Sequence, residues 1–171
     1  MKDIIVVFMQ KKNKIFFFNL SIVIIIFLID RISKIHVINL FDTLNDQQIF
    51  IVSFLNLYLI WNEGIAFGLL SFESKEIYNF ITFFIVIINI IIIYITLKIN
   101  DFRRYFFLII LGGSLGNLFD RFLYNAVPDF IDFHVGEFHW FIFNVADIFI
   151  TFGVIFMILL ELTGSKIENK I

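Results

Sequence analysis

The chain has no cysteine, a single proline and few charges: only 16% of its 171 residues are charged. Without cysteine it can form no disulfide, no thiol nucleophile and no cysteine-bound zinc or iron–sulfur centre. The formal net charge of −2 comes without any basic run, which argues against a nucleic-acid partner. The three histidines (His36, His134 and His139) lack metal-ligand spacing, so no metal site is expected.

Apolar residues dominate what remains. They make up 60% of the chain, and aromatic residues make up 19%, whereas soluble domains carry about 45–50% apolar residues. A chain of this length cannot hide so much apolar surface from water. The composition therefore predicts an integral membrane protein and excludes both a soluble globular enzyme and a disordered chain.

Four stretches are apolar enough to cross a bilayer, which needs about 20 residues. They cover residues 15–30, 77–97, 105–122 and 141–162. We expect one membrane domain over residues 1–171, all-α except for a small β-rich outer segment. The first stretch begins like a signal peptide, but no small-x-small cleavage site follows it, so it is expected to be retained.

Basic residues lie on one side of the predicted membrane. They occupy the N-terminal arm, the connection between the second and third stretches, and the C-terminal tail: Lys2, Lys11, Lys12, Lys14, Lys98, Arg103, Arg104, Lys166 and Lys170. Residues 35–76 contain one lysine, and residues 123–140 contain no lysine or arginine. The positive-inside rule therefore predicts cytoplasmic termini and two extracytoplasmic segments. Residues 49–61, apolar but too short to span, are expected to form a strand at the membrane surface.

Polar residues interrupt these apolar stretches near their outer ends, where a charged group costs roughly 2.5–3.5 kcal/mol to insert. Asp30 and Lys34 are spaced i, i+4, which suits a helical ion pair. Asn117, Asp120 and Arg121 share one helix face and are expected to bond one another. A structural ion pair beside a glycine packing groove would explain the same residues.

A second polar group precedes and enters the fourth stretch. Asp129 and Asp132 lie in an aromatic segment, and Asn144 and Asp147 follow at i, i+3 spacing. A helix cap would account for the last two. However, the apolar run begins at Phe141, which places Asp147 about two turns inside the expected helix.

Two carboxyl groups that meet away from bulk water suggest acid–base chemistry. Close carboxylates cannot both ionise, so they share a proton. One then acts as general base on a water, while the protonated one polarises a carbonyl and later protonates the leaving amine. This is the chemistry of an aspartic peptidase, and it needs no cofactor. The residues alone do not choose among Asp120, Asp129 and Asp132 as the partner of Asp147.

In this order, the polar blocks resemble those of bacterial lipoprotein signal peptidases (signal peptidase II). The resemblance extends from Asp30 to about Thr151. It is carried by five blocks: Asp30–Lys34, Asn62–Gly68, Gly112–Arg121, Val127–Phe130 and Phe143–Asp147. Ile65 and Ser114 each replace the usual alanine. Pro128 replaces a valine, which removes a backbone N–H and fixes φ just before Asp129.

The resemblance implies that Asp129 and Asp147 are the catalytic pair. It implies supporting roles at Asp30, Lys34, Asn62, Gly64, Gly113, Asn117, Asp120, Arg121, Asn144 and Ala146. The implied substrate is a prolipoprotein whose cysteine carries diacylglycerol, cut on the N-terminal side of that cysteine. We expect a monomer in the bacterial inner membrane, in contact with lipid, with its active site near the extracytoplasmic face.

Two other functions fit parts of the pattern. A small proton- or ion-coupled transporter would also carry intramembrane acids, but such acids tend to lie near the midplane, and no inverted repeat is visible. A non-catalytic scaffold would use the glycines for packing, but it would not need an Asn–Asp pair in the fourth stretch.

Overall fold

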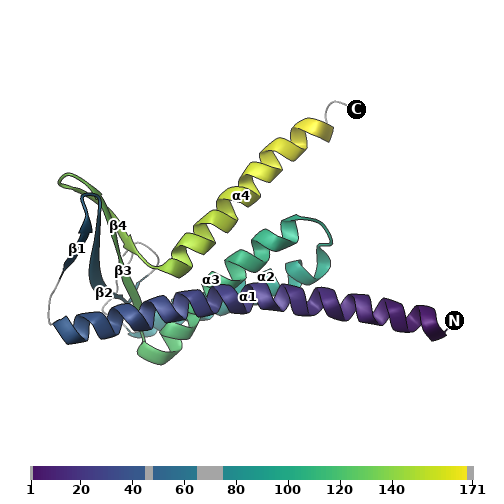
Figure 1. Cartoon of the computed structure of the whole chain (residues 1–171), viewed down its shortest axis with the longest axis horizontal. Coiled ribbons are helices and arrows are strands. Elements are labelled where there is room, and N and C mark those ends of the chain that lie inside the picture. The colour runs from purple at the N-terminus through teal and green to yellow at the C-terminus, as the bar shows by residue number, and fades with distance from the viewer. Residues whose placement is uncertain (1, 45–47, 65–74, 169–171) are drawn as a thin grey trace.

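The computed structural model describes the backbone of residues 2–44, 48–64 and 75–168, and the side chains of 13–44, 48–64 and 75–163. These ranges form four helices and one four-stranded sheet (Figure 1). The helices are α1 (Lys2–Leu44), α2 (Lys75–Lys98), α3 (Arg103–Tyr124) and α4 (Val145–Glu168). The strands are β1 (Ile49–Val52), β2 (Leu55–Asn62), β3 (Val127–Val135) and β4 (Phe138–Phe143).

Each helix contains a stretch long and apolar enough to cross a membrane. These stretches are Asn13–Leu44, Lys75–Lys98, Arg103–Tyr124 and Val145–Thr163. Many large apolar side chains point outward from them; Phe17 is 65% exposed and Leu97 is 69% exposed. Such a surface suits hydrocarbon and not water. The predicted architecture of four membrane-capable helices with a small sheet is confirmed.

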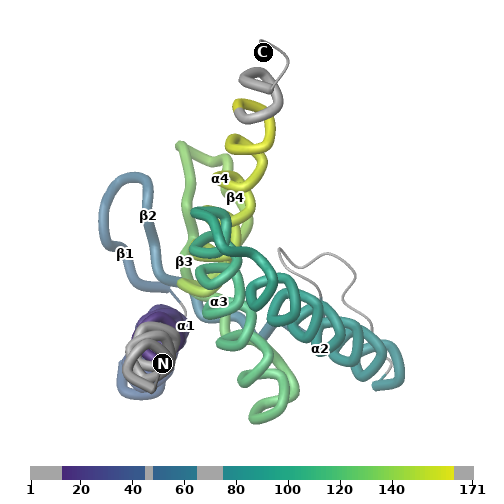
Figure 2. The backbone as a smooth tube through the Cα atoms, turned by 90° about the vertical axis from the view of Figure 1, so that its right-hand side faces the viewer, coloured from purple at the N-terminus to yellow at the C-terminus, as the bar shows by residue number. Residues whose placement is uncertain are grey.

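Helix α3 is the centre of the helical part. It contacts α1, α2 and α4, and Figure 2 shows it between α1, seen nearly end-on, and α2. Close approach depends on glycine at two positions. A Cβ on Gly116 would lie 2.4 Å from an Asp30 carboxylate oxygen, and one on Gly113 would lie 2.6 Å from the Ala146 carbonyl oxygen. The glycines thus bring polar groups of three helices together.

The sheet has the order β1-β2-β3-β4 with every pair antiparallel. It packs on the last turns of α1, where Val37 and Phe41 contact Phe130 of β3. In Figure 1 the two chain termini and the α2–α3 connection all lie away from the sheet. One end of the molecule is therefore built from sheet, and the other from helix ends.

The structure corrects the predicted boundaries at the sheet end. Helix α1 does not stop near residue 30 but continues to Leu44, so the segment 35–76 begins with helix. The single strand predicted over 49–61 is a hairpin, β1 and β2, with a turn at 53–54. The segment 123–140 contributes a second hairpin, β3 and β4, which was not predicted.

The fourth helix begins at Val145 and not at Phe141. Residues 141–143 are the end of β4, where Phe143 pairs with Ile131. An apolar strand running directly into an apolar helix leaves no break in hydropathy, so the pattern could not separate them.

Candidate active site

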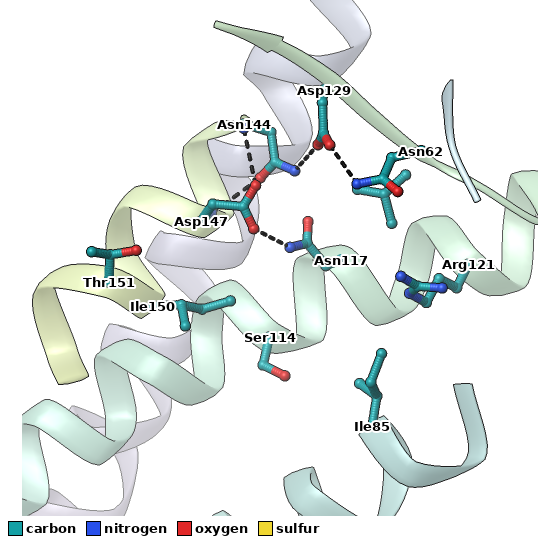
Figure 3. Close-up of a pocket in the computed structure, with 11 residues that line it drawn as sticks. Asn62, Ile85, Ser114, Asn117, Arg121, Asp129, Asn144, Asp147, Ile150 and Thr151 are labelled. Carbon is teal, nitrogen blue, oxygen red and sulfur yellow. Dashed lines mark hydrogen bonds between the residues drawn. The ribbon is translucent and has the colours of Figure 1, made fainter. Parts of the chain in front are cut away.

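The two predicted catalytic residues come from different elements and meet at one asparagine (Figure 3). Asp129 lies on β3 and Asp147 in the first turn of α4, and both are buried. Asn144, between them, donates from Nδ2 to Asp129 Oδ1 at 2.6 Å. Its Oδ1 accepts the backbone N–H of Asp147 at 3.1 Å. The two carboxyl groups therefore share one fixed neighbour.

Asn144 is the cap of α4. While its side chain accepts the Asp147 N–H, Asp147 Oδ2 accepts the Asn144 backbone N–H at 3.1 Å. This reciprocal pair is a capping box, and it satisfies two of the free donors at a helix start. The cap that the sequence offered as an alternative is thus present, and the expectation that Asp147 lies two turns inside the helix is wrong. Asn144 and Asp147 therefore both cap the helix and belong to the candidate site.

Each carboxyl group accepts one further amide bond. Asn62 Nδ2 donates to Asp129 Oδ2 at 2.8 Å, and Asn117 Nδ2 donates to Asp147 Oδ1 at 2.8 Å. Burial, and after it the nearby Asp147 carboxylate, raise the pKa of Asp129 from 3.8 to about 6, although the bonds from Asn62 and Asn144 oppose the rise. Asp129 can therefore hold a proton close to neutral pH.

A cavity of about 220 Å³ lies beside the two carboxyl groups (Figure 3). Its lining consists of Asn62, Ile85, Ser114, Asn117, Arg121, Val127, Asp129, Asn144, Asp147, Ile150 and Thr151. Polar groups therefore line one part of the cavity, and branched apolar side chains line the rest. That mixture is typical of a site that binds a chain and reacts with it.

Arg121 is 4% exposed and supplies the cavity's cation. One Nη2 N–H donates to the Gly64 carbonyl oxygen. Its Nε and Nη1 have no hydrogen-bond partner within the part of the chain that the structure describes. The guanidinium carbon also lies 5.2 Å from the centre of the Tyr78 ring. Among the described residues, the two donor atoms can therefore meet an acceptor brought by a ligand. Gly64 in turn donates its N–H to Asn62 Oδ1 at 2.8 Å, which fixes the amide beside Asp129.

Behind the cavity lies a buried charge cluster that joins α1 to α3. Lys34 Nζ donates to Asp30 at 2.8 Å, to Asp120 at 2.6 Å and to Asn117 at 2.7 Å. Asp120 also accepts from Arg31. The cluster contains two acids and two bases, so its charges balance. This balance is what makes such burial tolerable.

The cluster also holds the start of α4. Asp30 Oδ1 accepts the backbone N–H of Ala146 at 2.9 Å, and Ala146 is fully buried. Ala146, one of the predicted supporting residues, therefore contributes its backbone N–H, and its small side chain fits the buried position. The predicted Asp30–Lys34 pair is confirmed, although it lies well before the end of α1.

The predicted bonds among Asn117, Asp120 and Arg121 are replaced by longer-range ones. Asn117 bonds Lys34 and Asp147, Asp120 bonds Lys34 and Arg31, and Arg121 bonds Gly64. Local sequence reasoning missed Arg31, which is 8% exposed. Its signal was a second cation directly after Asp30 inside an apolar run.

The sequence alone left Asp132 as a possible partner of Asp147, but Asp132 does not line the cavity. It accepts from Asn56 at 3.5 Å and contacts His139 Nδ1 at 2.9 Å. His139 stacks on His134 with ring centroids 5.0 Å apart. Among the described side chains, no group of three or more acids and histidines is arranged to hold a metal ion. The residues 65–68 of the second resemblance block lie outside the described residues.

Pro128 fits the strand that carries Asp129. It pairs with Trp61 of β2, whereas the pairing of β3 with β4 starts further on, at Ile131 and Phe143. Proline is tolerated in a strand where its missing N–H would not have paired with a neighbouring strand. No residue of β4 pairs with Pro128. Asp129 therefore reaches Asn62 and Asn144 despite the proline before it.

We predict that Gly113→Ala lowers both stability and activity. The new Cβ would lie 2.6 Å from the Ala146 backbone oxygen, so α3 and α4 must separate. Overpacking of this kind costs about 1–3 kcal/mol, and displacement of Asn117 from Asp147 should reduce turnover roughly 100-fold. The matched control is Gly153→Ala in the same helix pair, where the nearest atom belongs to the Ile110 side chain. Equal losses of turnover in both variants would contradict the prediction.

The sequence matches the signal peptidase (SPase) II family over residues 22–163. A lipoprotein signal peptidase of Pelagibacter ubique is 52% identical over 165 residues, which cover 95% of this chain and 99% of the relative. One of Anaplasma phagocytophilum is 40% identical over 139 residues, covering 81% and 87%. A solved bacterial membrane enzyme, determined by the in meso method, superposes with a TM-score of 0.65 and 28% identity over 86% of this chain and 88% of its own. The chain therefore belongs to the signal peptidase II family, the aspartic peptidases that act as lipoprotein signal peptidases.

Proposed function

We propose that Asp129 and Asp147 of this signal peptidase cut diacylglyceryl-modified prolipoproteins on the N-terminal side of the lipidated cysteine. The observation that carries the assignment is the pair of buried carboxyl groups on one cavity, joined through Asn144. The pKa of Asp129, about 6, supports a pair that holds one proton in the working range of pH. The transporter that composition left open is not favoured, because the family is one of peptidases.

The proposed reaction uses the shared proton as general acid. The ionised carboxylate takes a proton from a water as its oxygen attacks the scissile carbonyl carbon. The protonated carboxyl polarises the carbonyl oxygen and then gives its proton to the leaving amine. Arg121, whose Nε and Nη1 have no hydrogen-bond partner among the described residues, is proposed to hold a peptide carbonyl next to the scissile bond.

An apolar groove beside the cavity supports a lipidated substrate. It has a volume of about 280 Å³ and is lined by Trp140, Phe143, Asp147, Ile148, Thr151, Phe152 and Ile155. Asp147 and Thr151 line both the groove and the polar cavity. An acyl chain in the groove would therefore place the cysteine that carries it close to the carboxyl pair.

We propose that the sheet end of the molecule is extracytoplasmic and that both termini are cytoplasmic, in the bacterial inner membrane. Lys98, Arg103 and Arg104 belong to the ends of helices that lie away from the sheet in Figure 1, and Lys14 lies at the start of the membrane-capable stretch of α1. This agrees with the positive-inside rule. We also propose a monomer that contacts membrane lipid; the lipid contact is supported by the large apolar side chains that point outward from the helices.

A cleavage assay tests the proposal directly. Purified protein in detergent is mixed with a diacylglyceryl-modified prolipoprotein, or with the same protein without lipid, and products are separated by gel shift. We expect cleavage of the lipidated form alone. Equal cleavage of both forms would show that the enzyme does not recognise the lipid. If the folded protein cleaved neither form, the proposed function would be contradicted.

The groove makes a separate prediction. Ile148→Trp should fill it and raise KM for the lipidated substrate about tenfold, which corresponds to roughly two buried CH₂ groups at about 0.8 kcal/mol each. The effect on kcat should be small because the carboxyl pair is untouched. Val154→Trp is the matched control, since Val154 is on the same helix, 42% exposed and outside the groove lining. A similar rise in KM in both variants would contradict an acyl site here.

A further inference from the structure

The amide of Asn117 has only one possible orientation. Lys34 Nζ lies 2.7 Å from Asn117 Oδ1, and an ammonium can only donate hydrogen bonds. The oxygen of the amide must therefore face Lys34, which turns Nδ2 the other way. There Nδ2 donates to Asp147 Oδ1 at 2.8 Å. Lys34 therefore acts on Asp147 through Asn117: it fixes the amide so that the NH₂ group, and not the oxygen, faces the Asp147 carboxylate.

The other oxygen of Asp147 also meets a donor that cannot reverse. Oδ2 accepts the backbone N–H of Asn144 at 3.1 Å, at the N-terminus of α4. Donors and the positive end of a helix both favour an ionised carboxylate. Arg121 lines the same cavity from α3 and adds positive charge. The acids of the neighbouring cluster, Asp30 and Asp120, are each paired with a base.

The surroundings of Asp129 are less favourable to charge. Both its oxygens accept from neutral amides, those of Asn62 and Asn144, and Asp129 lies on a strand and not at a helix start. Burial is the largest cause of its raised pKa, and the charge of Asp147 is the second. Lys34 opposes the rise in pKa less than the hydrogen bonds from Asn62 and Asn144 do. The two carboxyl groups of the pair are therefore not equivalent.

We propose that Lys34 is a positioning residue that acts through Asn117 to keep Asp147 ionised and so leaves the shared proton on Asp129. The inference rests on the proposed function of the pair. It assigns the steps: Asp147 takes the proton of the attacking water, and Asp129 polarises the carbonyl and protonates the amine as the C–N bond breaks. The proton on Asp147 then returns to Asp129, which restores the starting state.

The test is the pH profile of kcat/KM for the lipidated prolipoprotein. In the unaltered protein, the acidic limb reports ionisation of Asp147, and the alkaline limb, near pH 6, reports loss of the Asp129 proton. Activity should therefore fall as the pH rises through about 6. In Lys34→Met the acidic limb should move up by about one pH unit or more, because the donor at Asp147 is no longer fixed. The alkaline limb should move less.

Arg31→Met is the matched control. Arg31 bonds Asp120 as Lys34 does, and its loss changes the charge of the cluster by the same amount, but Asn117 keeps its bond to Lys34. We expect a similar loss of thermal stability with an unmoved acidic limb. Equal movement of the limb in both variants would mean that charge alone acts, which overturns the role of Asn117.

Asn117→Leu keeps the proposal testable if Lys34→Met does not fold, and it should move the acidic limb in the same direction. An unmoved limb in either folded variant overturns the inference, while cleavage by the unaltered protein leaves the proposed function standing. Failure of the unaltered protein to cleave the lipidated substrate would instead overturn the proposed function itself.

Discussion

Asp147→Asn is expected to reduce kcat for a diacylglyceryl-modified prolipoprotein by about 10³-fold or more, and Asp129→Asn should do the same. General acid–base groups typically contribute 10²–10⁴-fold, and neither amide can take a proton from water or give one to the amine. The new NH₂ group must also face a donor. In Asp129→Asn that donor is Nδ2 of Asn62 or Asn144, and in Asp147→Asn it is Nδ2 of Asn117 or the backbone N–H of Asn144. Single-turnover cleavage followed by gel shift measures the loss.

Asp132→Asn provides the control for both variants. Asp132 is buried on the same strand as Asp129, but it contacts Asn56 and His139 and does not line the cavity. Its variant should cleave within a few-fold of the unaltered protein. Retained cleavage in Asp129→Asn, with thermal melting showing a folded protein, would move the acid to another residue and end the assignment of the pair.

The helical part of the fold could be predicted because lipid imposes a simple rule on sequence. A helix must be apolar over about 20 residues to span the hydrocarbon, and each of the four helices meets this condition. The sheet end follows no such rule. Residues 141–143 are as apolar as the helix after them, and their place in β4 depends on pairing with β3, which local hydropathy does not record.

The choice among the aspartates shows the same limit. Asp129 and Asp132 are three apart, so in a strand they point to opposite faces. Had residues 127–135 been identified as a strand, the sequence would have separated the two but would not have said which face holds the cavity. The family resemblance made that choice, and the structure places Asp129 next to Asn144.

The partners of Asp120 depend on tertiary structure. Spacing within one helix suggested a pair with Arg121, the next residue in the chain. The observed partners, Arg31 and Lys34, lie more than 80 residues away on α1. Close packing of α1 against α3 at Gly116 allows this contact, and no local pattern specifies it.

Truncation of that cluster should give the largest loss of stability. Asp120→Leu removes a fully buried carboxylate and leaves Arg31 and Lys34 with one acid, Asp30, between them. Breaking a buried pair from one side costs about 3–5 kcal/mol, which corresponds to a fall in Tm of roughly 10 °C at 2–4 °C per kcal/mol. Thermal melting in detergent measures the change.

The double variant Asp120→Leu/Arg31→Met distinguishes loss of charge balance from loss of packing. It restores equal numbers of acids and bases, because Asp30 and Lys34 remain paired at 2.8 Å. If unpaired charge is the cause, the double variant should melt above Asp120→Leu, although it lacks one more native side chain. A double variant that melts lower, by the sum of the two single losses, would show that packing holds the helices together. Recovery of Tm should also restore part of the activity, because Asp30 and Lys34 connect the cluster to Ala146 and Asn117 at the candidate site.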